Sequence, residues 1–137
     1  MHTIKFSTLP GLERTGVFAP VIPVTFKNSV YEFATFALVD SGAEQGLIST
    51  VIADALHINW KSIPRKSGLA TSGSFLFHPI KDLTAMIFDY EFNLDINVVE
   101  GINAFKCILG RKDLFQKATI VFEGFKNQFK IEFRELN

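Results

Sequence analysis

The carboxylate of Asp40 is the side chain in this sequence best placed to do chemistry. It follows the apolar run 36–39, whose lack of alternation predicts a strand buried on both faces. The turn formers Ser41 and Gly42 end that run directly after Asp40. A carboxylate at the end of a buried strand could accept and donate protons in catalysis. Asp-Ser-Gly is also a common turn triplet, so the triplet alone does not decide between a simple turn and an active site.

The residues for metal, phosphate or nucleotide chemistry are missing or misplaced. The three histidines are far apart in the sequence, and the single cysteine, Cys107, cannot build a multi-cysteine zinc site. Segment 68–73 has the glycine spacing of a phosphate-binding loop, but Ser74-Phe75 stands where that loop needs Lys-Ser/Thr. We therefore expect no metal and no cofactor, and we expect Cys107 to be a buried, inert thiol. His57 is expected at the end of a helix, and His78 in a surface loop.

Composition narrows the class of protein further. With 137 residues, 47% hydrophobic and 20% charged, the chain is expected to fold as a single globular domain over 1–137. Fourteen basic and fourteen acidic residues give no net charge, which argues against a nucleic-acid partner. No apolar run approaches the roughly 20 residues that cross a bilayer, so we expect no membrane insertion. A single cysteine and no apolar leader favour the cytoplasm.

The elements that must position Asp40 are mostly strands. Alternation and β-branched or aromatic residues predict strands at 21–26, 30–39, 83–88, 92–99, 118–122 and 129–133. A helix is expected over 50–57, capped by Ser49, and one or two helical turns over 111–117. The 15 phenylalanines are scattered singly, which indicates a phenylalanine-rich β core. A hairpin, a buried strand ending at glycine and a short helix occur in each half, an approximate topological repeat.

A second motif gives Asp40 a context. The buried run Cys107-Ile108-Leu109 ends at Gly110 and is followed by Arg111, far from Asp40-Ser41-Gly42-Ala43 in sequence. Together the two motifs resemble the retropepsins, the single-domain aspartic proteases of retroviral type. The resemblance implies an all-β, closed barrel-like fold with one or two short helices, in which the two motif segments cross. It also implies a homodimer, because one such triplet per chain supplies only one of the two aspartates that the site needs.

The resemblance assigns roles residue by residue. It implies that Asp40 is catalytic and that the active-site loop is supported by Ser41, Gly42, Ala43, Ile108, Leu109, Gly110 and Arg111. Ser41 would bond across the dimer, and Arg111 would pair with a carboxylate near the loop. Gly42 and Glu44 would contact the substrate main chain. A flap at about 66–80 would close over the peptide, with Ala70, Thr71, Ser72 and Gly73 near its tip. The terminal strand 129–133 would interleave with the partner at the interface.

The function implied is that of a homodimeric aspartic endopeptidase acting on a peptide or protein substrate. Two carboxylates held close together cannot both ionise easily, so they would share a proton while one of them activates water. Two alternatives remain at this point. One is a catalytically silent module with the same fold that dimerises or binds peptides. The other is an unrelated β barrel with a fortuitous turn that binds a small apolar ligand.

Overall fold

The structure, a computed structural model, describes residues 1–8, 14, 16–70, 73–101 and 106–134, and only the main chain of residues 69, 70 and 73. The described strands are β1 (His2–Lys5), β2 (Val21–Asn28), β3 (Tyr31–Val39), β4 (Leu47–Ser49), β5 (Lys66–Ala70), β6 (Gly73–Ile87), β7 (Tyr90–Val99), β8 (Cys107–Leu109), β9 (Ala118–Glu123) and β10 (Gln128–Phe133). The helical elements are α1 (Thr50–Ala55), η2 (Trp60–Ser62), η3 (Arg111–Phe115) and η4 (Gly124–Lys126).

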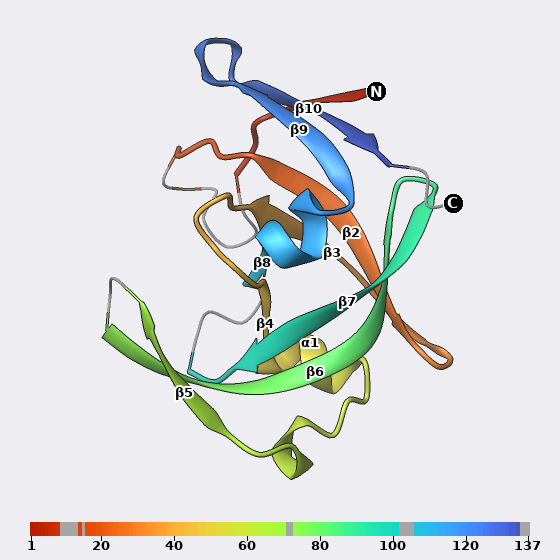
Figure 1. The fold of residues 1–137 in the computed structure, drawn as a ribbon, viewed down its shortest axis with the longest axis vertical. Coiled ribbons are helices and arrows are strands. Elements are labelled where there is room, and N and C mark those ends of the chain that lie inside the picture. The colour runs from red at the N-terminus through yellow and green to blue at the C-terminus, as the bar shows by residue number, and fades with distance from the viewer. Residues whose placement is uncertain (9–13, 15, 71–72, 102–105, 135–137) are drawn as a thin grey trace.

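Six of these strands close into a barrel. The larger sheet has the order β2-β3-β8-β4-β7-β6-β5, and β2 also pairs with β6, which closes the ring from β2 to β6. The closing pairs run from Thr25 opposite Met86 to Lys27 opposite Thr84. Strand β5 lies outside the closed ring and pairs with β6 as a projecting hairpin (Figure 1). The all-β, barrel-like architecture expected from the sequence is confirmed.

The barrel interior is filled by the alternating strands. In β7, Phe92, Leu94, Ile96 and Val98 are buried, while the polar residues at 91, 93 and 95 face outward. Side chains from β2, β8 and α1 complete one continuous core with them. Burial of this kind is the main stabilising contribution to such a domain. The described interior of the barrel is therefore a packed core. This argues against the alternative of a barrel that holds an apolar ligand inside.

A second, three-stranded sheet lies at one end of the molecule, opposite the β5–β6 hairpin (Figure 1). Its order is β1-β10-β9, and both pairings are antiparallel. Strand β10 thus has both of its edges occupied within its own chain. The expectation that strand 129–133 interleaves with a partner is wrong for this reason, and the free edges of this sheet belong to β1 and β9.

The two short helical segments expected from the sequence are present. Helix α1 buries Ile52 and Ala53 against the barrel. Segment η3 is one turn of π-helix, in which Phe115 N donates to the Gly110 carbonyl at 3.3 Å and Gln116 N to the Arg111 carbonyl at 3.1 Å. Within the described ranges, no helix is long and apolar enough to span a bilayer.

Candidate active site

The two sequence motifs meet because β8 lies between β3 and β4. It runs parallel to β3 and antiparallel to β4, with Leu38 opposite Ile108 and Val39 opposite Leu109. Parallel strands end at the same edge, so Asp40 and Gly110 leave the sheet side by side. The Asp40 amide completes the ladder by donating to the Leu109 carbonyl at 3.0 Å. The segment that contains β8 therefore crosses the loop that connects β3 to β4.

The Asp40 side chain is half-buried at this crossing. Its Oδ1 accepts a hydrogen bond from the Gly42 amide at 2.9 Å, and its carbonyl accepts one from Ala43 N at 3.3 Å. Ser41 and Gly42 are exposed beside it. Among the described residues, the carboxylate forms no other hydrogen bond. One oxygen is thus oriented by the loop while the other is available to a substrate, a water or a second copy.

Two glycines allow the crossing segments to approach closely. A Cβ at Gly110 would lie 2.5 Å from the Ala43 carbonyl oxygen, closer than real Cβ contacts come. A Cβ at Gly46 would collide with the Ile108 carbonyl and with the Asp113 carboxylate. Gly110 belongs to the predicted motif, whereas a role for Gly46 was not predicted. The only signal for Gly46 in the sequence is its place directly before the short strand β4, which was not predicted either.

Asp113 is the second carboxylate at the crossing, a residue whose type and position predicted only a solvated or capping role. It is 1% exposed, and its Oδ2 accepts hydrogen bonds from the amides of Gly46 and Gly110, the latter at 3.0 Å. Its Oδ1 is buried and has no partner among the described residues. Burial is the main cause that raises the pKa of Asp113 to about 6; the two amides oppose the shift and nearby Asp95 adds to it.

The raised pKa predicts how stability depends on pH. An aspartate in an unfolded chain titrates near pH ~3.9, so the folded protein binds this proton more tightly than the unfolded chain does. The contribution of this proton to the stability of the fold is therefore complete below about pH 4 and is lost as the pH rises through about 6. A shift of this size corresponds to roughly 3 kcal/mol. We expect the unfolding free energy of wild type, relative to Asp113→Asn, to fall by about this amount between about pH 4 and 8. Urea denaturation measures it, and parallel curves for the two proteins would contradict it.

The side chains of Arg111 and Glu44 both have partners within the chain. The predicted pairing of Arg111 with a carboxylate is wrong within the described residues: its Nη1 donates instead to the Ser41 carbonyl at 3.5 Å. Lys112 forms the ion pair, with 3.0 Å between its Nζ and Oε1 of Glu44. The hydrogen bond from Lys112 is the main cause that lowers the pKa of Glu44. Glu44 is thus an exposed, ionised carboxylate on the rim of the Asp40 loop.

The β5–β6 hairpin occupies the place of the predicted flap. Its strands pair from Lys66 opposite Phe77 to Ala70 opposite Gly73. Thr71 and Ser72, assigned to the flap tip, lie outside the described residues, and only the main chain of Ala70 and Gly73 is described. The hairpin projects from the barrel as a two-stranded arm (Figure 1). Its contact with a substrate remains a prediction.

His78 lies at the base of this hairpin and is 4% exposed, so its assignment to a surface loop is wrong. Its Nδ1 lies 2.8 Å from the Ile63 carbonyl, and its Nε2 lies 2.9 Å from Oε2 of Glu100. The ring thus connects the Ile63 carbonyl to the Glu100 carboxylate. Arg65 approaches the same Glu100 oxygen at 3.7 Å. The network ties the start of β5 to the end of β7.

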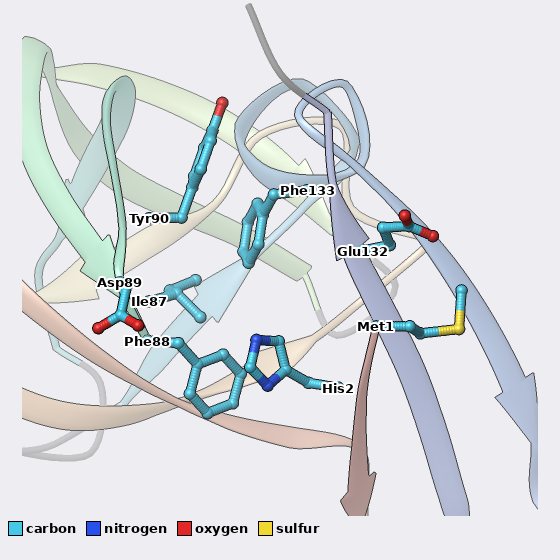
Figure 2. A pocket seen from close by; sticks show the side chains of 8 residues that line it. All are labelled: Met1, His2, Ile87, Phe88, Asp89, Tyr90, Glu132 and Phe133. Carbon is cyan, nitrogen blue, oxygen red and sulfur yellow. The ribbon is translucent and has the colours of Figure 1, made fainter.

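A hollow of about 250 Å³ lies elsewhere, between the β6–β7 turn and strands β1 and β10. Figure 2 shows that its aromatic side chains come as two pairs, His2 with Phe88 and Tyr90 with Phe133. The rings of each pair stack, with centroids 4.2 Å and 4.5 Å apart. None of the lining residues comes from the Asp40 loop or from β8. The hollow is therefore separate from the crossing that carries Asp40.

Cys107 lies in the barrel core and not at the surface of the crossing. Cys107 is 1% exposed, and burial raises the pKa of its thiol, with the Asp113 charge adding to the effect. A thiol in this state is a poor nucleophile, as the sequence predicted. In the part of the chain that the structure describes, no three His, Cys, Asp or Glu side chains gather in a way that could hold a metal ion.

Known proteins resemble this chain in fold rather than in sequence. No protein-family model matches it, and neither does any curated protein. Among solved structures it resembles a retropepsin-like aspartic protease from Rickettsia conorii, with a TM-score of 0.68 and 22% identity over 96% of this chain and 97% of that one. It also resembles the retroviral protease-like domain of Ddi1 from Leishmania major, with a TM-score of 0.58 and 18% identity over 85% and 90%. The chain has a retropepsin-like fold, which confirms the fold class that its two motifs indicated.

Proposed function

We propose that this protein is an aspartic endopeptidase that acts as a homodimer, with Asp40 of each copy forming the catalytic pair. The observation that carries the proposal is the crossing of β3, β8 and β4, which leaves Asp40 half-buried with one oxygen bonded to Gly42 and the other available. The fold shared with a protein described as an aspartic protease supports it. A carboxylate held on a rigid crossing can activate a water for peptide hydrolysis.

The chemistry follows from bringing two such carboxylates together. Like charges at close range cannot both ionise easily, so the pair holds one proton between them and titrates as a unit. The ionised Asp40 takes a proton from a water that attacks the peptide carbonyl, and the protonated Asp40 of the second copy gives its proton to the carbonyl oxygen. The tetrahedral intermediate then collapses: the first carboxyl passes its proton to the amide nitrogen, the C–N bond breaks, and the second takes a proton back from the hydroxyl, so the pair again holds one proton. No covalent intermediate is formed. Gly42, which has no Cβ, lets the peptide main chain approach, and Glu44 offers an acceptor for a peptide amide.

The surface that receives the second copy is proposed to include the edge of β9. Strand β10 is enclosed between β1 and β9, which leaves β9 with an unpaired edge among the described strands. Three large apolar side chains on β9 and the turn after it are exposed: Val121 at 44%, Phe122 at 41% and Phe125 at 84%. An exposed apolar edge strand is a template for pairing with another chain. Pairing of β9 with β9 would satisfy twofold symmetry.

The homodimer predicts that activity depends on protein concentration. Specific activity should fall on dilution through the dimer dissociation constant, because a monomer holds only one carboxylate. Val121→Lys should move that fall to a concentration at least tenfold higher, since a charge on an edge strand opposes pairing. Val30→Lys, at an 83% exposed position in the β2–β3 turn, is the matched control. Sedimentation and cleavage rates across the same dilution series measure both effects. If both variants sedimented as monomers and still kept the same specific activity at all dilutions, the homodimer would be contradicted.

The direct test of the function is cleavage of a diverse peptide library by the purified protein across acidic to neutral pH, read by mass spectrometry. Cleavage with a bell-shaped pH profile is expected from a proton-sharing pair. Absence of cleavage at concentrations where the protein is dimeric would refute the peptidase. That result would leave the alternative of a silent, peptide-binding module with this fold.

A cytoplasmic location is part of the same proposal. Its support is chemical: the chain has one cysteine, which is a buried free thiol, so its fold depends on no intrachain disulfide that an oxidising compartment would have to form. Fractionation of cells that produce the full-length protein tests the location.

A further inference from the structure

The Asp40 loop, residues 40–46, is held by η3 through three consecutive side chains. Two of these contacts are exposed: Arg111 to the Ser41 carbonyl at 3.5 Å, and Lys112 to the Glu44 carboxylate at 3.0 Å. Exposed contacts of this kind contribute little, because water and salt screen them. They fix the orientation of the exposed side of the loop only weakly.

The third side chain, Asp113, makes the buried contact. Its Oδ2 accepts from Gly46 at the far end of the loop and from Gly110 at the start of η3. The near end of the loop is fixed separately, by the bond from Asp40 N to the Leu109 carbonyl at 3.0 Å. Because Asp113 is 1% exposed, neither amide would find water as a substitute acceptor if the carboxylate were removed.

We propose that Asp113 is a positioning residue for Asp40, whose carboxylate fixes the far end of the Asp40 loop against the β8–η3 segment. The inference rests on the proposed catalytic role of Asp40. Between the two ends, the loop is also bonded to the first turn of η3: Arg111 N donates to the Ala43 carbonyl and Lys112 N to the Glu44 carbonyl, both at 2.9 Å. The Asp113 carboxylate fixes that turn through the Gly110 amide and the far end of the loop through the Gly46 amide. Its loss therefore loosens both attachments, and the Asp40 carboxylate no longer keeps one place relative to a bound peptide.

The cost of such a loss falls on the chemical step. A displacement of about 1 Å between a reacting group and its substrate lowers the rate by as much as ~100-fold. Asp113 does not line the exposed side of the loop, where Gly42 and Glu44 are proposed to contact the peptide. Its removal is therefore expected to lower kcat while KM stays nearly constant.

The kinetic test compares three variants. Asp113→Leu replaces the carboxylate by an apolar side chain of similar size and should lower kcat roughly tenfold to a hundredfold, with KM within about twofold. Asp113→Asn keeps an acceptor for both amides and should restore kcat to within about threefold of wild type. Gln116→Ala, at the exposed end of η3, is the matched control and should match wild type. An equal loss of kcat in the Leu and Asn variants, or a change confined to KM, would overturn the positioning role.

A second readout does not depend on peptidase activity. Amide hydrogen exchange followed by NMR should be at least about tenfold faster at Gly42, Gly46 and Gly110 in Asp113→Leu, with the amides of β10 unchanged. If Asp113→Leu fails to fold, Asp113→Ala provides the same comparison with a smaller side chain. Unchanged exchange at these three glycines would overturn the inference even if activity fell. Faster exchange in a protein that cleaves no peptide would support the anchoring of the loop while refuting the proposed function.

Discussion

Asp40→Asn should abolish peptide hydrolysis while leaving the fold intact. The amide cannot take a proton from water, so the activating step is lost, and we expect a fall of at least about 1,000-fold in kcat/KM. The amide oxygen can still accept the hydrogen bond from Gly42 that the structure gives to Oδ1. The loop should therefore keep its shape. The measurement is the cleavage rate of the best library peptide at several pH values.

The control for this variant is Asp89→Asn, the same chemical change at an exposed position in the β6–β7 turn. It should cleave at the wild-type rate. Thermal unfolding and sedimentation of both variants must match wild type, so that the loss is attributable to chemistry. Wild-type cleavage by Asp40→Asn would refute the mechanism, whatever the fold neighbours suggest.

The fold could be predicted where local patterns coincide with burial. The alternation of Phe92, Leu94, Ile96 and Val98 is the pattern of a strand with one face in the core, and β7 has that form. The unbroken run before Asp40 predicted a strand that ends there, and β3 ends at Val39, but the expected burial on both faces is wrong because Phe36 is 46% exposed. These features depend on residues close together in sequence, so the sequence alone contains them.

The features that could not be predicted depend on contacts between distant residues. Asp113 sits in Arg-Lys-Asp, a charged triplet typical of a solvated surface, yet its partner Gly46 is 67 positions away. His78, next to Pro79, has the sequence context of a loop. It is nevertheless buried, and its ring nitrogens contact a carbonyl 15 positions before it and a carboxylate 22 positions after it. The edges of β10 are likewise occupied by strands that alternation cannot identify.

The crossing also sets which glycines the fold requires. Gly46→Ala should be among the most destabilising single substitutions in the chain, because the new methyl group meets the Ile108 carbonyl and the Asp113 carboxylate, both held in the buried crossing. Neither group can move without breaking the hydrogen bonds between the Asp40 loop and η3. We expect a loss of about 3 kcal/mol or more in the unfolding free energy, equivalent to a fall of roughly 10 °C in Tm. Calorimetry of the full chain measures it.

Gly124→Ala is the matched control, since a methyl group there meets nothing within 4 Å. It should leave Tm within about 2 °C of wild type. The contrast separates a steric requirement at the crossing from the general effect of replacing glycine, which restricts the unfolded chain in both variants. If Gly46→Ala were as stable as Gly124→Ala, the two segments would not approach as closely as the structure describes. The anchoring of the Asp40 loop by Asp113 would then lose its geometric basis, because the same close approach brings the Gly46 amide to that carboxylate.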